Sequence, residues 1–158
     1  MHDSLLLSGE SLLRLDNPHW QGRLTALARK ARLADAADQA AVIGEARRLL
    51  GLAPAAYLIE VPDMAVIEAM LAARAFESAV LALLPEAAAY MVSRGEGTVL
   101  ASIVLPGMAE EVTMPGATFG LAMIAALGGA LVETAGDGAC ERDAMRAIGP
   151  IPASHRLN

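Results

Sequence analysis

Between residues 90 and 122 the sequence reads YMVSRGEGTVLASIVLPGMAEEVTMPGATFGLA. The segment from Thr98 to Leu105 alternates with period two, which is typical of a strand that buries one face. One side of this strand comprises Val99, Ala101, Ile103 and Leu105, and the other comprises Leu100, Ser102 and Val104. The segment from Tyr90 to Ser93 predicts a partner strand, because the two glycines within residues 94–97 favour a hairpin turn.

A third strand and a helix follow the hairpin. We expect the strand from Glu110 to Met114, with Val112 and Met114 facing inward. Pro-Gly then ends this strand at residues 115–116. A further helix is predicted from Phe119 to Thr134, because a threonine precedes it in the position that caps a helix.

Upstream of the strands the apolar spacing is helical. Apolar residues recur there at steps of three and four, as on one face of a helix. The predicted helices are Trp20 to Leu33, Ala36 to Leu50, and a long one from Met64 to Leu84 with a break near residues 75–78. Pro54 and Pro62 bracket a short segment that we expect to be an extended link.

These elements predict an α+β fold, in which a helical N-terminal part precedes a small α-β-β-β-α sandwich with an antiparallel sheet. The expected parts are a lead-in (1–18), a helical segment (19–62), the α-β-β-β-α domain (63–135) and a C-terminal tail (136–158). The tail begins Gly136-Asp137-Gly138, which favours a turn that ends the preceding helix. A short helix is expected within the tail, from Glu141 to Ile148.

Short motifs between residues 76 and 133 point to a family. They are Ala82-Leu83-Leu84-Pro85-Glu86, the glycine-turned hairpin, and Ala117-Thr118-Phe119-Gly120-Leu121-Ala122 at the start of a helix. This region resembles the small α-β-β-α "ABA sandwich" domains of phage and prophage proteins. In that family the last helix typically opens with Ala-Thr-Pro-Ala-Leu-Ala and the strands tend to carry Trp, and this chain departs from both patterns. The resemblance implies a phage or prophage origin and no known catalysis.

The same order of elements occurs in double-stranded-RNA-binding domains, but the charges argue against RNA binding. Those domains place lysines at the start of the last helix to contact phosphates. Here residues 116–120 carry no cation, and Arg94 is the only basic residue between positions 75 and 141. Because neutralised phosphates supply most of the affinity for nucleic acids, the sequence carries no strong nucleic-acid signal.

The one basic cluster lies in the first predicted helix. Its residues are Trp20, Arg23, Arg29, Lys30 and Arg32. A basic amphipathic helix with an aromatic residue can contact an anionic surface, either a membrane or a nucleic acid. The alternative, which we favour, is a solvated face whose charges meet the acidic C-terminal region of the same chain or of a second copy.

No motif indicates a catalytic residue, a cofactor or a metal. Cys140 is the only cysteine, which excludes an internal disulfide and a cysteine-based zinc site, and the three histidines lack ligand spacing. Glu110 and Glu111 would point to opposite faces of a strand and so cannot share a proton; they favour a charged edge that discourages aggregation. We therefore expect no cofactor and no metal, and we favour a protein without enzymatic activity over an enzyme.

The uncharged stretch from residue 112 to residue 132 raises the question of a membrane span. Polar and turn-forming residues interrupt its first third and no Lys or Arg flanks it, so a buried core helix explains it better. The N-terminus is acidic and its apolar run is short, unlike a signal peptide. The expected location is the cytoplasm or a phage-type particle.

The function that the sequence favours is structural or protein-interacting, through self-association or docking on a larger assembly. The apolar fraction is 55%, more than one small core readily hides, and opposite charges in the two halves would guide a homo-oligomer. Two alternatives stay open. One is a small-molecule binder or enzyme without a recognisable motif, with a pocket of Tyr57, Tyr90, Arg74 and a carboxylate. The other is anionic-surface binding by the basic N-terminal helices.

Overall fold

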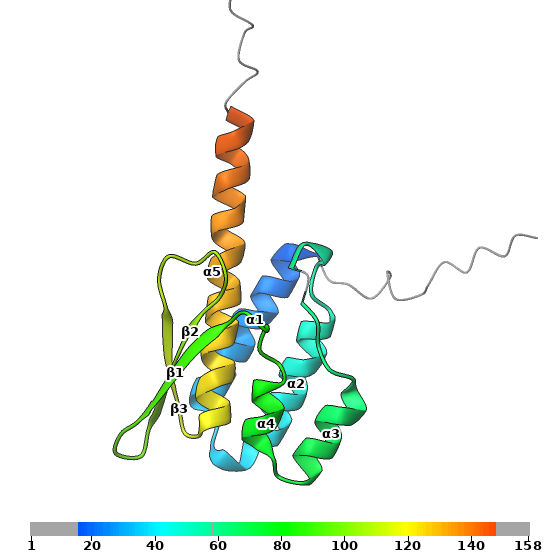
Figure 1. Ribbon diagram of the computed structural model, residues 1–158, viewed down its shortest axis with the longest axis vertical. Coiled ribbons are helices and arrows are strands. Elements are labelled where there is room, and N and C mark those ends of the chain that lie inside the picture. Colours follow the sequence, from blue (N-terminus) through cyan, green and yellow to red (C-terminus); the bar gives the residue numbers. More distant parts are fainter. Residues whose placement is uncertain (1–15, 58, 148–158) are drawn as a thin grey trace, which may run out of the picture.

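The computed structural model describes residues 16–57 and 59–147, with side chains as far as Ala135 (Figure 1). The chain folds as α+β, with a helical N-terminal part, a three-stranded antiparallel sheet and a C-terminal helix, as predicted. The elements in order are α1 (Asn17–Leu33), η2 (Ala36–Asp38), α2 (Gln39–Gly51), η3 (Ala55–Tyr57), α3 (Met64–Ala72), α4 (Phe76–Leu81), β1 (Ala89–Arg94), β2 (Val99–Val104), β3 (Val112–Gly116) and α5 (Phe119–Ala147).

The helices lie on one side of the sheet (Figure 1). Helix α5 packs directly against β2 and β3, and α1 packs along α5 and also reaches β3. Helices α2 and α4 contact α5 from the side away from the sheet, and α3 packs against both of them. We call the face of the sheet that meets α5 the inner face.

The inner face of the sheet is set by the alternation in β2. Strand β2 is central and runs antiparallel to both neighbours, and Ile103 stands in register between Tyr90 of β1 and Val112 of β3. Residues in register share a face. Val99, Ala101 and Ile103 are all buried beneath the helices, so the side of the strand that carries them faces inward.

The backbone at the start of α5 packs tightly against Gly116 of β3. A Cβ atom placed there would lie 2.4 Å from the backbone nitrogen of Ala122. The third strand was predicted to end at Met114, whereas β3 continues to Gly116, so the predicted strand ends too early. Thr118 does cap the helix, because its Oγ1 accepts a hydrogen bond of 3.2 Å from the Leu121 nitrogen.

Helix α1 begins at Asn17, earlier than predicted from the apolar pattern. Proline is tolerated in a first helical turn, where its missing N–H has no partner to lose, so Pro18 does not delay the helix. Asp16 caps the helix by accepting a hydrogen bond of 3.0 Å from the backbone nitrogen of His19. The hydrogen bond from the His19 side chain, together with this backbone bond, holds the pKa of the Asp16 carboxyl below its ordinary value.

The long helix predicted from residue 64 to residue 84 is divided in two. Helix α3 ends at Ala72 and α4 begins at Phe76, so the break lies slightly before the predicted position. Arg74 lies in the break with a φ of 58°, in the left-handed region that usually ends helices at glycine. The adjacent backbone closes with hydrogen bonds from Arg74 to Leu71 (3.0 Å) and from Ala75 to Met70 (2.8 Å).

The last helix is longer than predicted. Helix α5 continues through Gly136-Asp137-Gly138 to Ala147, so those glycines do not form the expected turn, and most of the short helix expected from Glu141 to Ile148 belongs to α5. Glycine lowers helix stability by only about 1 kcal/mol. The lead-in as far as residue 15 and the tail from residue 148 lie outside the described residues.

The helical segment and the α-β-β-β-α domain share one hydrophobic core. Trp20 and Ile43 from the first part join Ile67, Ile103 and Leu121 from the second in a single cluster of buried side chains. The N-terminal helices therefore pack against α5, and α1 also contacts β3, so that both parts contribute to one core.

Candidate functional site

Trp20 does not lie on the surface where the basic cluster was expected to present it. Its side chain is fully buried, and its Nε1 donates a 2.8 Å hydrogen bond to the backbone oxygen of Leu49. Its ring also lies against Tyr57, with centroids 4.5 Å apart. Trp20 is thus a core residue that ties α1 to α2, and its assignment to an anionic-surface contact was wrong.

The four cations of the cluster are exposed on α1. Lys30 forms a 2.5 Å ion pair with Glu45 of α2, and this pair is about half exposed. Arg23, Arg29 and Arg32 have no ion pair with any residue that the structure describes. The exposure of these cations fits the favoured interpretation of a solvated face, although the partner of Lys30 comes from α2 and not from the acidic C-terminal region. The exposed Leu33 lies beside Arg29 and Lys30 on the same helix.

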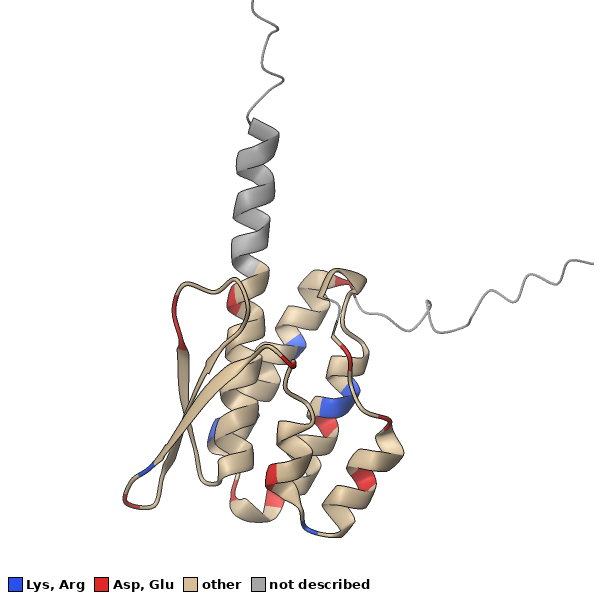
Figure 2. Cartoon of the chain, viewed as in Figure 1, with Lys and Arg blue, Asp and Glu red and all other residues tan. Residues whose placement is uncertain are grey.

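The outer face of the sheet, on the side away from α5, is uncharged. Its eight side chains are those of Ala89, Met91, Ser93, Leu100, Ser102, Val104, Thr113 and Pro115. Figure 2 shows charged residues at the two ends of the sheet and none along the middle of its strands. Met91 is 63% exposed and Leu100 is 43% exposed, so the outer face presents large apolar side chains to solvent.

The two polar side chains at the centre of the outer face satisfy each other. Ser102 on β2 and Thr113 on β3 stand in register, and their hydroxyl oxygens are 2.6 Å apart. Ser102 is buried, with only 7% of its surface exposed. In this contact one hydroxyl donates and the other accepts, so each keeps one hydrogen-bond partner when the centre of this face loses water.

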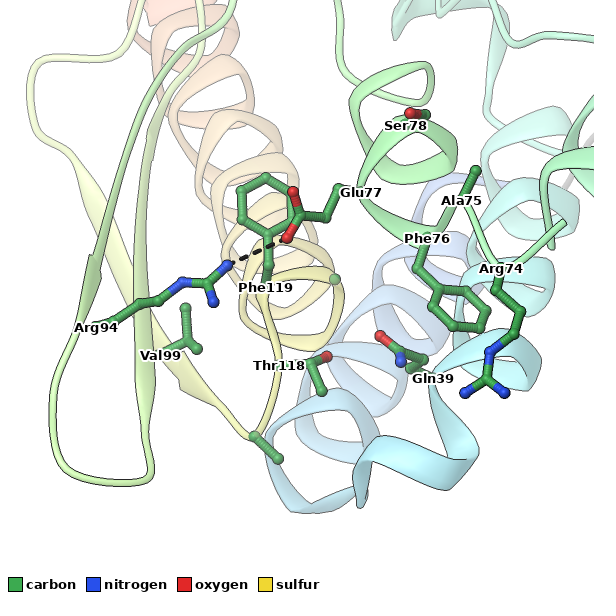
Figure 3. A pocket seen from close by; sticks show the side chains of 12 residues that line it. Gln39, Arg74, Ala75, Phe76, Glu77, Ser78, Arg94, Val99, Thr118 and Phe119 are labelled. Carbon is green, nitrogen blue, oxygen red and sulfur yellow. Dashed lines mark hydrogen bonds and ion pairs between the residues drawn. The ribbon is translucent and has the colours of Figure 1, made fainter.

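A cavity of about 520 Å³ lies where the first turn of α5 meets α4 and the end of β1 (Figure 3). Both phenylalanines of the chain, Phe76 and Phe119, line it. Arg94 reaches from β1 toward α4, where its Nη2 donates a 3.1 Å hydrogen bond to Glu77 Oε1. The other residues that line the cavity are Gln39, Arg74, Ala75, Ser78, Val99, Ala117, Thr118 and Gly120.

The pocket expected from Tyr57, Tyr90, Arg74 and a carboxylate does not form as such. Arg74 lines the cavity at α5, whereas Tyr57 lines a second cavity of about 800 Å³ near the end of α4, and Tyr90 lines neither. The phenylalanines and Arg94 come together through packing of α4, β1 and α5. Because these residues lie far apart in the sequence, no sequence pattern predicted that they would line one cavity.

Three properties of the described part bear on chemistry. Glu110 and Glu111 precede β3 instead of lying within it, and both are exposed. Among the described residues, no group of three or more His, Cys, Asp or Glu side chains could hold a metal ion. Within the same residues, no helix is long and apolar enough to cross a membrane.

In comparisons with known proteins, no family model, no curated protein and no solved structure matches the chain.

Proposed function

We propose that this chain is a non-catalytic interaction protein that pairs with a second copy of itself through the outer face of its sheet. The observation that supports the proposal is the exposure of Met91 and Leu100 on a sheet face without a charged side chain. A large apolar patch on a protein surface is typical of an interaction site, whereas single exposed apolar residues are common everywhere. Of the other large exposed apolar side chains, Leu33, Val66 and Leu81 lie on three different helices. Tyr90, 48% exposed, lies in the edge strand β1 in register with the inward-facing Ile103.

A second copy is the partner that the charges favour. A surface without charge is best matched by another uncharged surface, because burying an unpaired charge against it is costly. The same face on a second copy meets this condition, and a two-fold axis brings the two faces together. Two sheets pack face to face in many β-sandwiches, at a distance of about 10 Å. The side chains of the two faces that meet fill the space between them.

The paired hydroxyls of Ser102 and Thr113 support burial of the face. In such a dimer they would lie near the centre, where unpaired polar groups weaken an interface. Their 2.6 Å contact leaves each of them with a partner. The apolar side chains around them, Met91 and Leu100 above all, would then supply the affinity through burial.

Sedimentation of the whole chain across a range of concentrations tests the proposal. We expect the mass to rise from 16.3 kDa toward twice that value, and the double variant Met91→Lys/Leu100→Lys to stay at the monomer mass. The matched control is Leu33→Lys on α1, which replaces a side chain of 76% exposure away from the sheet and should still dimerise. Circular dichroism checks that each variant is folded.

The uncharged contact also predicts how salt acts. Raising the salt to about 0.5 M should leave the dimer intact, because salt screens charges and spares apolar burial. A wild-type chain that stays monomeric at every concentration would contradict the proposal, as would equal dissociation of the Leu33→Lys control.

The wider setting of this assembly also stays a proposal. The resemblance of residues 76–133 to ABA-sandwich domains supports a phage or prophage origin, in which a self-associating domain would serve a structural role. Location in the cytoplasm or in a phage-type particle is part of the same proposal.

A further inference from the structure

We propose that the cavity at the start of α5 binds a small organic anion, a carboxylate or a phosphate attached to a flat apolar ring. We call this cavity the α5 pocket; it is the 520 Å³ space lined by Phe76, Phe119, Arg74 and Arg94. It lies on the helix side of the sheet, away from the outer face, so this proposal does not depend on dimerisation.

The walls of the α5 pocket suit a flat apolar group. The chain has only two phenylalanines, and both line this one cavity. In Figure 3 Phe119, from the start of α5, lies beside the Arg94–Glu77 contact, and Phe76, from the start of α4, lies beyond Glu77 toward Arg74. Aromatic side chains bind flat rings by stacked or edge-to-face contacts. A pocket of this size holds a small molecule rather than a peptide.

The charges of the α5 pocket favour an anion. Arg74 and Arg94 outnumber Glu77, the one carboxylate in the lining, although the whole chain carries a net charge of −6. The first turn of α5 adds backbone N–H groups at the same place, and such groups favour negative charge. Arginine is the side chain that best matches a carboxylate or phosphate, because its fork of donors can make two parallel hydrogen bonds.

Arg94 keeps donors free for a ligand. The contact with Glu77 uses only Nη2, and the two side chains are 67% and 63% exposed, so the ion pair is weak. An incoming anion therefore competes with Glu77 for one guanidinium group. This competition predicts that removal of the two charges changes the ligand affinity in opposite directions. Loss of the Arg94 charge should lower the affinity, and loss of the Glu77 charge should raise it.

The test is a titration of the whole chain with phenyl phosphate, followed by backbone NMR shifts and by calorimetry. Arg94→Gln should weaken binding at least tenfold, and Glu77→Gln should tighten it several-fold because the competing carboxylate is gone. Arg23→Gln, on an exposed part of α1, is the matched control and should bind like wild type. If the ion pair has a structural role alone, both pocket variants should change in the same direction, which would overturn the proposal.

Arg74→Gly provides a second variant that should not harm the fold. Arg74 has a φ of 58°, a conformation that glycine adopts without strain, so this variant should melt at or above the wild-type temperature. Binding of phenyl phosphate should nevertheless weaken several-fold. Wild-type affinity in this variant would exclude Arg74 from the site.

Further probes define the ligand class. Benzoate should bind in the same place if a carboxylate suffices, and phosphate-only binding would narrow the class to phosphates. Benzyl alcohol and benzylamine should bind at least tenfold more weakly than phenyl phosphate, and equal binding of either would overturn the anion assignment. Inorganic phosphate that binds as tightly as phenyl phosphate would overturn the role of the phenylalanines.

Discussion

On the inner face of the sheet Ile103 is completely buried beneath α5, whereas Leu100 on the outer face of the same strand is 43% exposed. Both sides of β2 are apolar in sequence, so the alternation alone does not distinguish them. The difference comes from the helices, which lie against one face of the sheet (Figure 1). The inner face therefore stabilises the single chain, and the outer face stays exposed to solvent.

The largest expected effect is on the inner face. Ile103→Ala should lower the free energy of unfolding by about 2–5 kcal/mol, because it removes buried methyl groups and leaves a cavity beneath α5. Urea denaturation of the purified variant measures this loss. An unchanged midpoint would mean that Ile103 does not belong to the core, and the comparison of the two faces would fail.

Close packing makes a second prediction for the inner face. Gly116→Ala should destabilise the fold by about 1–3 kcal/mol, because the added Cβ would lie 2.4 Å from the backbone of Ala122 and must push α5 away. Gly95→Ala in the hairpin turn is the matched control, since a Cβ there would meet no atom within 4 Å. Thermal melts should separate the two variants clearly, and equal melting temperatures would show that α5 can shift without cost.

The strands could be predicted because their signals are local. Period-two alternation in β2 and the two glycines of the hairpin depend on neighbouring residues, and β2 lies within the predicted range. The helix boundaries depend more on distant contacts. A break near residues 75–78 was predicted, but the sequence did not indicate the left-handed conformation of Arg74, which is typical of glycine.

The candidate sites were harder to predict than the fold. Trp20 resembled a surface anchor among cations, but the buried partner that holds it, the Leu49 oxygen, lies on another helix. The α5 pocket likewise combines Phe76, Arg94 and Phe119 from three separate elements. Sites of this kind follow from tertiary packing, for which a single sequence carries no periodic signal.

The hydroxyl pair predicts a smaller effect on the outer face. Ser102→Ala should cost about 0.5–1.5 kcal/mol, because it removes the 2.6 Å hydrogen bond to Thr113. Ser93→Ala, on the same face but exposed and in the edge strand β1, should be close to neutral. Urea denaturation of the two variants at low protein concentration measures the difference. A loss in Ser93→Ala as large as that in Ser102→Ala would contradict the role of the pair.

The smallest effect on the monomer, and the sharpest separation of the two faces, is expected from Leu100→Ala. An exposed side chain contributes little to folding, so at low concentration the change should stay within about 0.5 kcal/mol. Association stabilises the folded state by mass action, however, so the melting temperature of wild type should rise with concentration while that of Leu100→Ala rises less. Ile103→Ala acts within a single chain, so its melting temperature should be lowered by the full amount even at low concentration. Melts of all three proteins across a hundredfold range of concentration make the measurement. If the Leu100→Ala deficit does not grow with concentration, the outer face is exposed without being an interface.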